Sequence, residues 1–340
     1  MTAFCSTNHR NQIMNNFSYT PATTTQQAST VLKTDKQAAF IAGGTALIDL
    51  MKANIEQHSQ LVDINRLPLL GITAAGATLR LGALERMSDT AEHPAVVQGF
   101  PAVSQALLLS ASPQLRNMAS LGGNLLQRTR CPYFRDVAFP SNKRVPGSGC
   151  PAQTGDNRTL AILGTSTACI ATQASDLAVA LVALDAELTL TDAKGQSRPV
   201  PLTDFYKLPG TTPHLENQLQ PGEIITAITM PNAGHARRSL YLKVRDRASY
   251  AYALVSAAVG LDVQGGIIRS ARVALGGVGT VPWRVQATEK LLVGQAPTEA
   301  TFRAAAAAAV REAAPREHNK FKVELVQRTL VRALSDVAAV

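Results

Sequence analysis

The 340-residue sequence has few of the residues on which small secreted proteins and many hydrolases depend: it contains four cysteines, six histidines and one tryptophan. The cysteines do not form the dense pattern of a disulfide scaffold. The histidines are scattered, and no spacing suggests a catalytic triad or a zinc motif. No apolar run reaches the roughly 18 residues that a membrane-spanning helix needs. These absences argue against a disulfide-rich module, a hydrolase and a membrane span.

The N-terminal region lacks the apolar segment of a secretory signal and also lacks a twin arginine. Residues 1–13, which include Cys5, are polar and patternless. We expect them to be a disordered or mis-assigned extension, with Met14 as an alternative start. With no signal in this chain, we expect the protein in the cytoplasm, or in the periplasm if a signal-bearing partner exports it.

The overall composition is that of a soluble globular protein, with 46% hydrophobic and 17% charged residues, and the length allows two or three domains. The net charge is +9, but the basic residues are spread, with local concentrations only at 128–135 and 237–247. Nucleic-acid-binding domains instead show dense Lys/Arg clusters interleaved with aromatic residues. The basic balance favours partner docking or an anionic cofactor. Nucleic-acid binding is the weakest of the functions considered.

The hydrophobic periodicity predicts mixed helices and strands. Residues 178–184 form an apolar run, helical or buried, and a Pro/Gly-rich connector at 210–222 marks the expected main domain boundary. The last third predicts an antiparallel sheet packed by helices, so that the fold class is α+β. We expect helices at 20–38, 46–52, 97–110, 252–261, 298–313 and 323–337, and strands at 39–42, 61–64, 79–83, 186–191, 198–202, 224–228, 238–243 and 267–273.

Two glycine turns are candidate phosphate sites. Ala42-Gly43-Gly44-Thr45 lies where a strand meets a helix, and Leu121-Gly122-Gly123-Asn124 is a second turn of the same kind. Adjacent glycines let the backbone approach a ligand closely, and the free N–H groups at a helix start favour phosphate. Two such turns can hold the two phosphates of a dinucleotide. The alternative for each is a tight turn without a ligand, and no G-x-G-x-x-G or Walker sequence is present.

Three of the four cysteines lie in a long Pro/Gly/Arg-rich stretch that ends at Asp176. Nineteen positions separate Cys131 from Cys150, and nineteen more separate Cys150 from Cys169. Thiolates in loops beside arginines are typical of iron–sulfur ligation. Zinc is the competitor, but no histidine lies between Cys131 and Cys169 to complete four ligands. With three thiols, a metal site and a metal-free loop both stay open from spacing alone.

Together these motifs resemble the FAD-binding medium subunit of the xanthine dehydrogenase family of molybdenum hydroxylases. The resemblance covers nearly the whole chain from Met14. It is closest to bacterial molybdenum-dependent aldehyde oxidoreductases whose flavin subunit carries a [4Fe-4S] cluster. The residues that carry it are Ala42-Gly43-Gly44-Thr45, Gln114-Leu115-Arg116-Asn117, Gly122-Gly123-Asn124, Arg130-Cys131-Pro132-Tyr133-Phe134, Gly147-Ser148-Gly149-Cys150, Ala174-Ser175-Asp176, Lys243 and Pro282-Trp283-Arg284.

The resemblance implies a vanillyl-alcohol-oxidase-type FAD-binding domain with two subdomains, followed by a C-terminal α+β domain of antiparallel sheet plus helices. The expected bounds are 14–215 for the FAD-binding domain, with subdomains of about 14–70 and 71–215 and a cysteine-bearing insertion at about 125–175, and 222–340 for the C-terminal domain.

The resemblance also implies the residues that hold FAD, and it implies no catalytic residue in this chain. Both glycine turns contact the pyrophosphate, and Asp176 and Lys243 approach the rest of the cofactor. From its position before an apolar run alone, a helix cap is the slightly favoured interpretation of Asp176. The implied cofactor-binding residues are Ile41, Ala42, Gly43, Gly44, Thr45, Ala46, Leu47, Leu121, Gly122, Gly123, Asn124, Asp176 and Lys243.

The implied cluster ligands are Cys131, Cys150 and Cys169, with Ser141 at the position where cluster-bearing relatives have a fourth cysteine. A serine alkoxide can ligate iron, but it is a harder ligand than a thiolate. The alternatives are a Ser-ligated [4Fe-4S] cluster, a [3Fe-4S] cluster, or a retained loop without a cluster. We expect a cluster, because three cysteines remain.

The function that the resemblance implies is an electron relay. A molybdopterin-binding large subunit oxidises the substrate, an aldehyde, and a small subunit with two [2Fe-2S] clusters passes the electrons to the FAD of this chain and on to an external acceptor. The chain alone would not oxidise an aldehyde. The alternatives are the flavin subunit of a carbon monoxide dehydrogenase- or hydroxybenzoyl-CoA reductase-like complex, and a cofactor-free scaffold.

Overall fold

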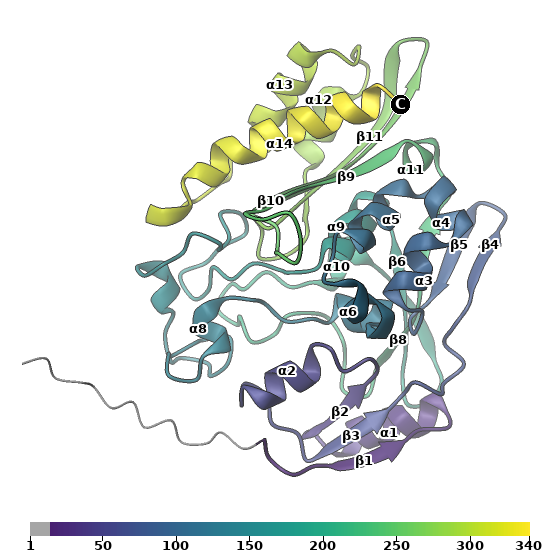
Figure 1. The fold of residues 1–340 in the computed structure, drawn as a ribbon, viewed down its shortest axis with the longest axis vertical. Helices are drawn as coiled ribbons and strands as arrows, with labels where there is room; N and C mark the ends of the chain where they lie inside the picture. The colour runs from purple at the N-terminus through teal and green to yellow at the C-terminus, as the bar shows by residue number, and fades with distance from the viewer. Residues whose placement is uncertain (1–13) are drawn as a thin grey trace, which may run out of the picture.

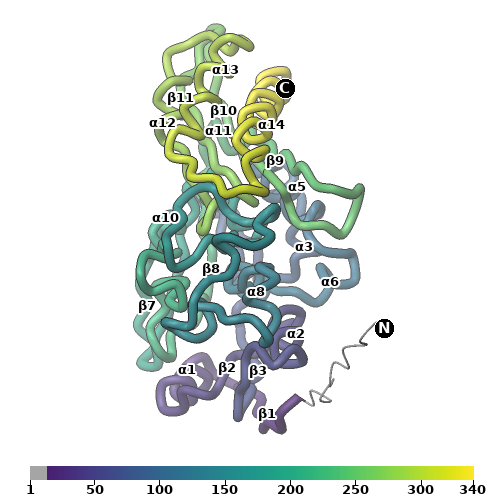
Figure 2. The backbone as a smooth tube through the Cα atoms, turned by 90° about the vertical axis from the view of Figure 1, so that its left-hand side faces the viewer, coloured from purple at the N-terminus to yellow at the C-terminus, as the bar shows by residue number. Residues whose placement is uncertain are grey.

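The computed structural model describes residues 14–340, so the expected N-terminal extension, residues 1–13 with Cys5, lies outside the described residues. Within this range the strands form three sheets. Figures 1 and 2 show the N-terminal sheet at one end of the molecule, the second sheet in the middle and the C-terminal domain at the other end.

The first sheet is parallel, with the order β1-β3-β2. Its strands are β1 (Ser18–Pro21), β2 (Ala38–Ile41) and β3 (Gln60–Asp63), with helices α1 (Thr25–Thr34) and α2 (Leu47–Lys52). The helix predicted at 20–38 is shorter, because the Thr24 side chain accepts a hydrogen bond from the Gln27 N–H and sets the start of α1. The preceding residues pair with β3 as a strand that the periodicity did not predict.

The second sheet is antiparallel, with the order β4-β5-β8-β6-β7. Its strands are β4 (Ile72–Ala75), β5 (Thr78–Gly82), β6 (Glu187–Thr191), β7 (Ser197–Pro201) and β8 (Ile224–Pro231). Strand β8 pairs with both β5 and β6, which suits its nearly continuous burial. The domain boundary expected at 215–222 therefore falls before a central strand of this sheet, and the chain passes to the third sheet only after Pro231.

The third sheet is antiparallel, with the order β12-β11-β10-β9. One face carries the helices α12, α13 and α14, whose apolar side chains share a core with β10 and β11. The expected antiparallel sheet packed by helices is confirmed. The bounds are β9 (Ser239–Val244), β10 (Val255–Gln264), β11 (Ile267–Gly276), β12 (Trp283–Arg284), α12 (Gln286–Leu292), α13 (Glu299–Ala308) and α14 (Phe321–Ala338).

The helix predicted at 252–261 is wrong, because this segment enters strand β10. The run from Val255 to Leu261 is buried at every position, so it shows no alternation of polar and apolar residues. Periodicity cannot separate a fully buried strand from a buried helix. Pairing with β9 on one side and β11 on the other decides the conformation.

Two helices lie between the second and third sheets and join their cores. Helix α5 (Pro101–Leu108) packs against β9, and α9 (Asp176–Ala183) packs against β10 and β11. One apolar cluster contains side chains from both helices, from the second sheet and from the back of the third sheet. The start of α9 therefore lies where the part of the chain that holds the second sheet meets the part that holds the third sheet.

The helix predicted at 97–110 is divided in two. Phe100 has φ −144° and ψ 56°, outside the helical region, and Pro101 begins the next helix because it has no backbone N–H to donate. The remaining short helices are α3 (Met87–Glu92), α4 (Pro94–Gly99), α6 (Pro113–Met118), α7 (Leu121–Leu125), α8 (Pro132–Arg135), α10 (Leu202–Phe205) and α11 (Gly234–Arg237), with 3₁₀ turns at Pro151–Gln153 and Glu317–Asn319.

The cysteine-bearing insertion, residues 125–175, has a small core of its own around Cys131, Phe134 and Cys169, with Leu50 and Ile55 from the first subdomain.

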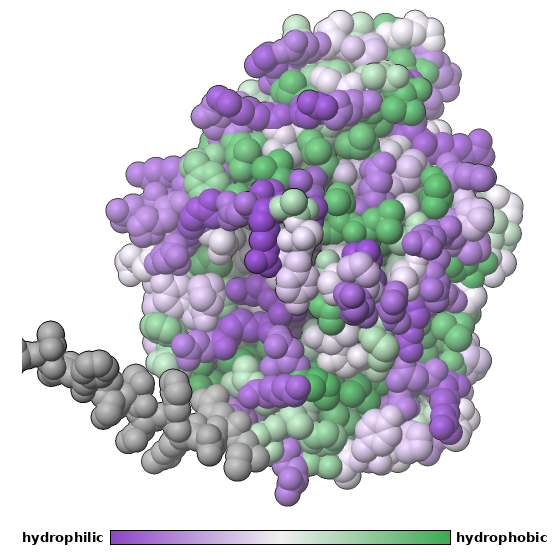
Figure 3. Space-filling model, in the orientation of Figure 1, coloured by the Kyte–Doolittle hydropathy of each residue, from purple (hydrophilic) through white to green (hydrophobic). Residues whose placement is uncertain are grey.

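Figure 3 shows strongly hydrophilic side chains along α14 and over the loops near the centre of this face. Among residues 14–340, no helix combines the length and apolar character that crossing a membrane requires.

Gly43 allows the first glycine turn to pack against the chain between α6 and α7. A Cβ atom at Gly43 would lie 2.0 Å from the Met118 carbonyl oxygen, which is backbone and cannot move aside. Gly43→Ala should therefore destabilise the protein by roughly 1–3 kcal/mol, measured by denaturant unfolding. Gly99→Ala is the matched control, because a Cβ there meets no atom within 4 Å. Equal stability of the two variants would contradict this packing.

Candidate functional site

A cleft runs between the first subdomain, the second subdomain and the C-terminal domain. It consists of two adjoining cavities of about 290 Å³ and 630 Å³, within the size range of small-molecule sites. Thr45, Asn124, Arg130 and Tyr252 line both cavities, so the two are parts of one elongated site. An elongated ligand with chemically different ends fits this shape.

The first glycine turn lies in the wall of the first cavity and leaves its backbone donors free. Residues 41–47 all line this cavity. Gly44 has φ +70°, a conformation that favours glycine. In the described part of the chain, the N–H groups of Gly44, Thr45 and Ala46 donate to no protein acceptor. Successive free N–H groups before a helix form an anion-binding nest.

The second glycine turn lies opposite, but its N–H groups are already used. Those of Leu121 and Gly122 donate to the carbonyls of Glu85 and Ala83, and that of Gly123 donates to the Ser120 hydroxyl. Gly122, Gly123 and Asn124 line the first cavity, whereas the Leu121 side chain is fully buried in the core. The second turn therefore supplies a close wall, and the first supplies the free donors.

Asp176 and Lys243 form a buried ion pair in the second cavity. The Lys243 ammonium lies 2.7 Å from Asp176 Oδ2, and the Ser110 hydroxyl donates to the same oxygen at 3.0 Å. The Tyr241 hydroxyl donates to Oδ1 at 2.5 Å. Ser175, rather than Asp176, caps helix α9 by accepting from the Ala178 N–H. Asp176 is thus free to organise polar groups at the cavity.

Unpartnered polar atoms also line the second cavity. Arg130 Nε, Gln173 Nε2 and Ser256 Oγ are buried, and each lacks a hydrogen-bond partner in the described residues. A buried donor without a partner costs free energy. A ligand with acceptor atoms would supply hydrogen-bond partners for these donors. Arg130 and Gln173 line this cavity but are not among the cofactor-binding residues predicted from the sequence. The signal was available, since Gln173 directly precedes Ala174-Ser175-Asp176.

The cysteines of the insertion come together around a third, small cavity of about 10 Å³. Cys131, Cys150, Cys169 and Ser141 all line it. The described cysteines carry free thiols. Over residues 14–340, no three His, Cys, Asp or Glu side chains are close enough to hold a metal ion. The free space is that of about one water molecule, so the side chains would have to move apart to admit a cluster.

Burial favours the protonated form of the three thiols. Burial raises the pKa of Cys131 to about 11, although the backbone N–H groups of Phe134 and Tyr133 oppose it. Burial likewise raises the pKa of Cys150 and of Cys169. Such thiols are poor nucleophiles at neutral pH, and a metal must displace their protons to bind.

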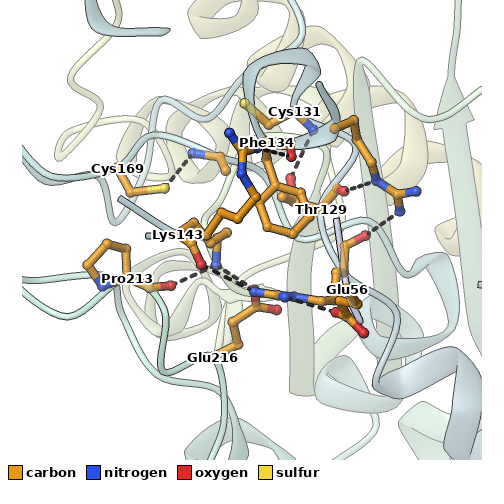
Figure 4. A network of polar contacts seen from close by, with 12 residues as sticks. Glu56, Thr129, Cys131, Phe134, Lys143, Cys169, Pro213 and Glu216 are labelled. Atoms are coloured by element: carbon orange, nitrogen blue, oxygen red, sulfur yellow. Dashed lines mark hydrogen bonds and ion pairs between the residues drawn. The ribbon is translucent and has the colours of Figure 1, made fainter. Parts of the chain in front are cut away.

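A half-buried ionic network joins Lys143, which lines the cysteine cavity, to Glu56 and Arg128, which line the first cavity of the cleft (Figure 4). The Arg128 guanidinium lies 2.8 Å from both Glu56 and Glu216, and Lys143 lies 3.0 Å from Glu216. Burial favours the protonated form of Glu216, but Lys143 and Arg128 outweigh it and lower the pKa of that carboxyl. Because Glu56 belongs to the first subdomain, the network ties the insertion to it.

The family of the chain follows from two matches. Residues 15–233 match the family described as the FAD binding domain in molybdopterin dehydrogenase, and residues 240–337 match the CO dehydrogenase flavoprotein C-terminal domain. The chain therefore belongs to this family of flavoprotein oxidoreductase subunits. The expected fold class and the expectation of FAD are confirmed.

Known relatives agree with this assignment. The chain is 46% identical to the aldehyde oxidoreductase FAD-binding subunit PaoB of Escherichia coli (strain K12), over 96% of this chain and 99% of that protein. It is 27% identical to the carbon monoxide dehydrogenase medium chain of Hydrogenophaga pseudoflava, over 88% of each. A solved structure of carbon monoxide dehydrogenase from the same organism matches with a TM-score of 0.75 and 26% identity, covering 96% of this chain and 99% of that chain.

The free N–H groups of the first turn generate a test of anion binding. Ala46 precedes α2 and makes no side-chain cap. Ala46→Asp places a carboxylate beside those N–H groups, where its negative charge repels a pyrophosphate, while aspartate is well tolerated before a helix. We expect the purified variant to fold but to lose its FAD, measured by flavin absorbance per protein. Ala46→Asn, similar in size but neutral, should keep FAD; full FAD content in both variants would contradict the nest.

Proposed function

We propose that the chain is the FAD-binding electron-transfer subunit of a molybdenum-dependent aldehyde oxidoreductase. The observation that carries the proposal is the cleft: free backbone donors at the first glycine turn lead into a cavity lined by unpartnered polar side chains. The identity of 46% to a subunit named for aldehyde oxidoreductase supports the substrate class.

FAD would lie along the cleft with its pyrophosphate in the middle. The N–H groups of Gly44, Thr45 and Ala46 would hold the phosphates, with Gly122 and Gly123 as the opposite wall. The isoalloxazine would occupy the larger, second cavity, where a carboxylate and donor groups suit its ring N–H and carbonyl edge. When bound, FAD supplies the chemistry of accepting an electron pair and releasing single electrons.

The side chains of the second cavity position the ring and control its charge. Lys243, fixed by Asp176, places a cation at the cavity wall, and Arg130 Nε and Gln173 Nε2 offer hydrogen bonds to ring acceptors. Cationic and donor groups stabilise negative charge that arrives with electrons. None of these residues exchanges a proton with an aldehyde, so no catalytic residue is assigned to this chain.

The partners would be a molybdopterin-binding large subunit and a small subunit with two [2Fe-2S] clusters.

The complex of all three subunits should oxidise an aldehyde and reduce the FAD anaerobically, whereas the isolated chain should do neither. Carbon monoxide serves as one comparison substrate, because two relatives at 27% identity are carbon monoxide dehydrogenase medium chains, and a hydroxybenzoyl thioester serves as another. A complex that oxidises carbon monoxide but no aldehyde would favour the flavin subunit of a carbon monoxide dehydrogenase-like complex. A purified chain that contains no FAD would favour the cofactor-free scaffold.

The insertion would hold an iron–sulfur cluster. Its donor set, three thiols and one hydroxyl around one cavity, has the chemistry for it. Backbone N–H groups near each sulfur and the cation of Lys143 near Cys169 would offset the charge of bound thiolates. A cubane spreads its ligands wider than a single ion does, so the lack of a single-ion site is compatible with a cluster after the side chains move outward.

Ser141 generates the test of the cluster. Ser141→Cys should raise the iron and acid-labile sulfide of anaerobically purified protein to about four irons per chain, because a thiolate is the better fourth ligand. Ser148→Cys is the control: Ser148 is an exposed residue of the same loop and does not line the cavity. Iron contents near zero in the wild type and in both variants would contradict the cluster and show that the cysteine loop holds no iron.

A further inference from the structure

A buried lysine lies behind the wall of the second cavity and plays no part in the site described above. Lys322, the second residue of α14, is fully buried. Its Nζ donates to the Leu160 carbonyl at 3.0 Å and to the Gly277 carbonyl at 2.7 Å. Leu160 and Gly277 both line the second cavity. The amine is therefore separated from the cavity by the residues that it holds.

The surroundings of Lys322 suit an amine better than an ammonium. A neutral amine has two N–H groups, which the two carbonyls satisfy, whereas an ammonium has a third that finds no partner here. Across residues 14–340, no carboxylate lies within ion-pair distance of it, in contrast to Lys243, which pairs with Asp176. The buried lysine can thus gain or lose its proton without breaking either hydrogen bond.

The charge near Lys322 also favours the neutral amine over the ammonium. Burial, and then the charge of Arg158 in the insertion, lower the pKa of Lys322 to about 7. Arg158 itself pairs with Asp246 of the β9–β10 loop. On α14, Glu324 pairs with Arg328 at the surface. Gly277 contributes only its backbone carbonyl to the surroundings of Lys322.

We propose that Lys322 takes up a proton when the FAD in the second cavity is reduced and releases it when the FAD is reoxidised. This inference rests on the proposed function, because it needs the isoalloxazine in that cavity. Two electrons from the iron–sulfur partner add negative charge to the cofactor. One proton from solvent then forms an N–H bond on the Lys322 amine, and the resulting ammonium offsets part of that charge. Lys322 acts through space and is not a catalytic residue.

The sign of the effect fixes its pH window. Below about pH 7 the lysine is already charged when FAD is oxidised, so reduction draws no extra proton. Above that pH the oxidised form holds a neutral amine, and reduction raises its proton affinity. Each proton coupled to a two-electron reduction lowers the midpoint potential by about 30 mV for a tenfold fall in proton concentration. The coupling therefore makes the potential fall more steeply with rising pH.

The test is the midpoint potential of FAD against pH in the purified full chain, followed by flavin absorbance. From about pH 7 to about pH 9 the wild-type slope should exceed that of Lys322→Gln by one proton, about 30 mV per pH unit. Lys322→Arg, permanently charged, should show the same shallower slope but a higher potential than Lys322→Gln. Equal slopes in wild type and both variants, at equal FAD content, would overturn the proposal.

A surface variant covers the case in which the buried substitutions do not fold. Arg158 is half-exposed, and Arg158→Gln removes the charge that disfavours the Lys322 ammonium. The steeper region should then begin at a higher pH than in the wild type, and an unchanged onset would count against the proposal. Wild-type protein that binds no FAD would refute the proposed function itself, whereas FAD-loaded protein with unaltered slopes refutes only the role of Lys322.

Discussion

The buried ion pair between Asp176 and Lys243 holds together the parts of the protein that enclose the cleft. Asp176 begins α9, which lies between the second and third sheets, and Lys243 belongs to β9 of the third sheet. Removing one partner of such a pair leaves a buried charge without compensation, at a cost of about 3–5 kcal/mol. Ser110 and Tyr241 bind the same carboxylate from two further directions. This one carboxylate therefore links α9, Ser110 just after α5, and β9 at the wall of the second cavity.

The cysteine-bearing insertion also connects separate parts of the chain around the cleft. Its Arg128 binds Glu56 of the first subdomain, its Arg158 binds Asp246 of the β9–β10 loop, and its Leu160 carbonyl receives Lys322 from α14. The insertion therefore contacts three separate parts of the chain while enclosing the three cysteines. These contacts connect the cysteine cavity to the parts of the chain that line the cleft.

The sequence predicts the chemistry of this protein better than some of its local structure. The glycine turns, Asp176 and the cysteines stand out because their residue types are unusual for their context, and the structure brings them to the cavities. Periodicity predicts a helix at 252–261 because residues 255–261 of β10 are all buried, so the strand's partners decide its conformation. The ion pair of Asp176 with Lys243 and the role of Gln173 depend on contacts across distant residues, which no local pattern contains. Gly43 lines the first cavity as predicted for a ligand contact, and its missing Cβ also accommodates Met118, a packing role that no local pattern contains.

The most direct test of the account is the position of FAD in a crystal of the flavin-loaded chain. We predict electron density for the pyrophosphate within hydrogen-bond distance of the N–H groups of Gly44, Thr45 and Ala46, and for the isoalloxazine beside Asp176 and Lys243. An isoalloxazine in the first cavity, or a pyrophosphate away from the first glycine turn, would contradict the account.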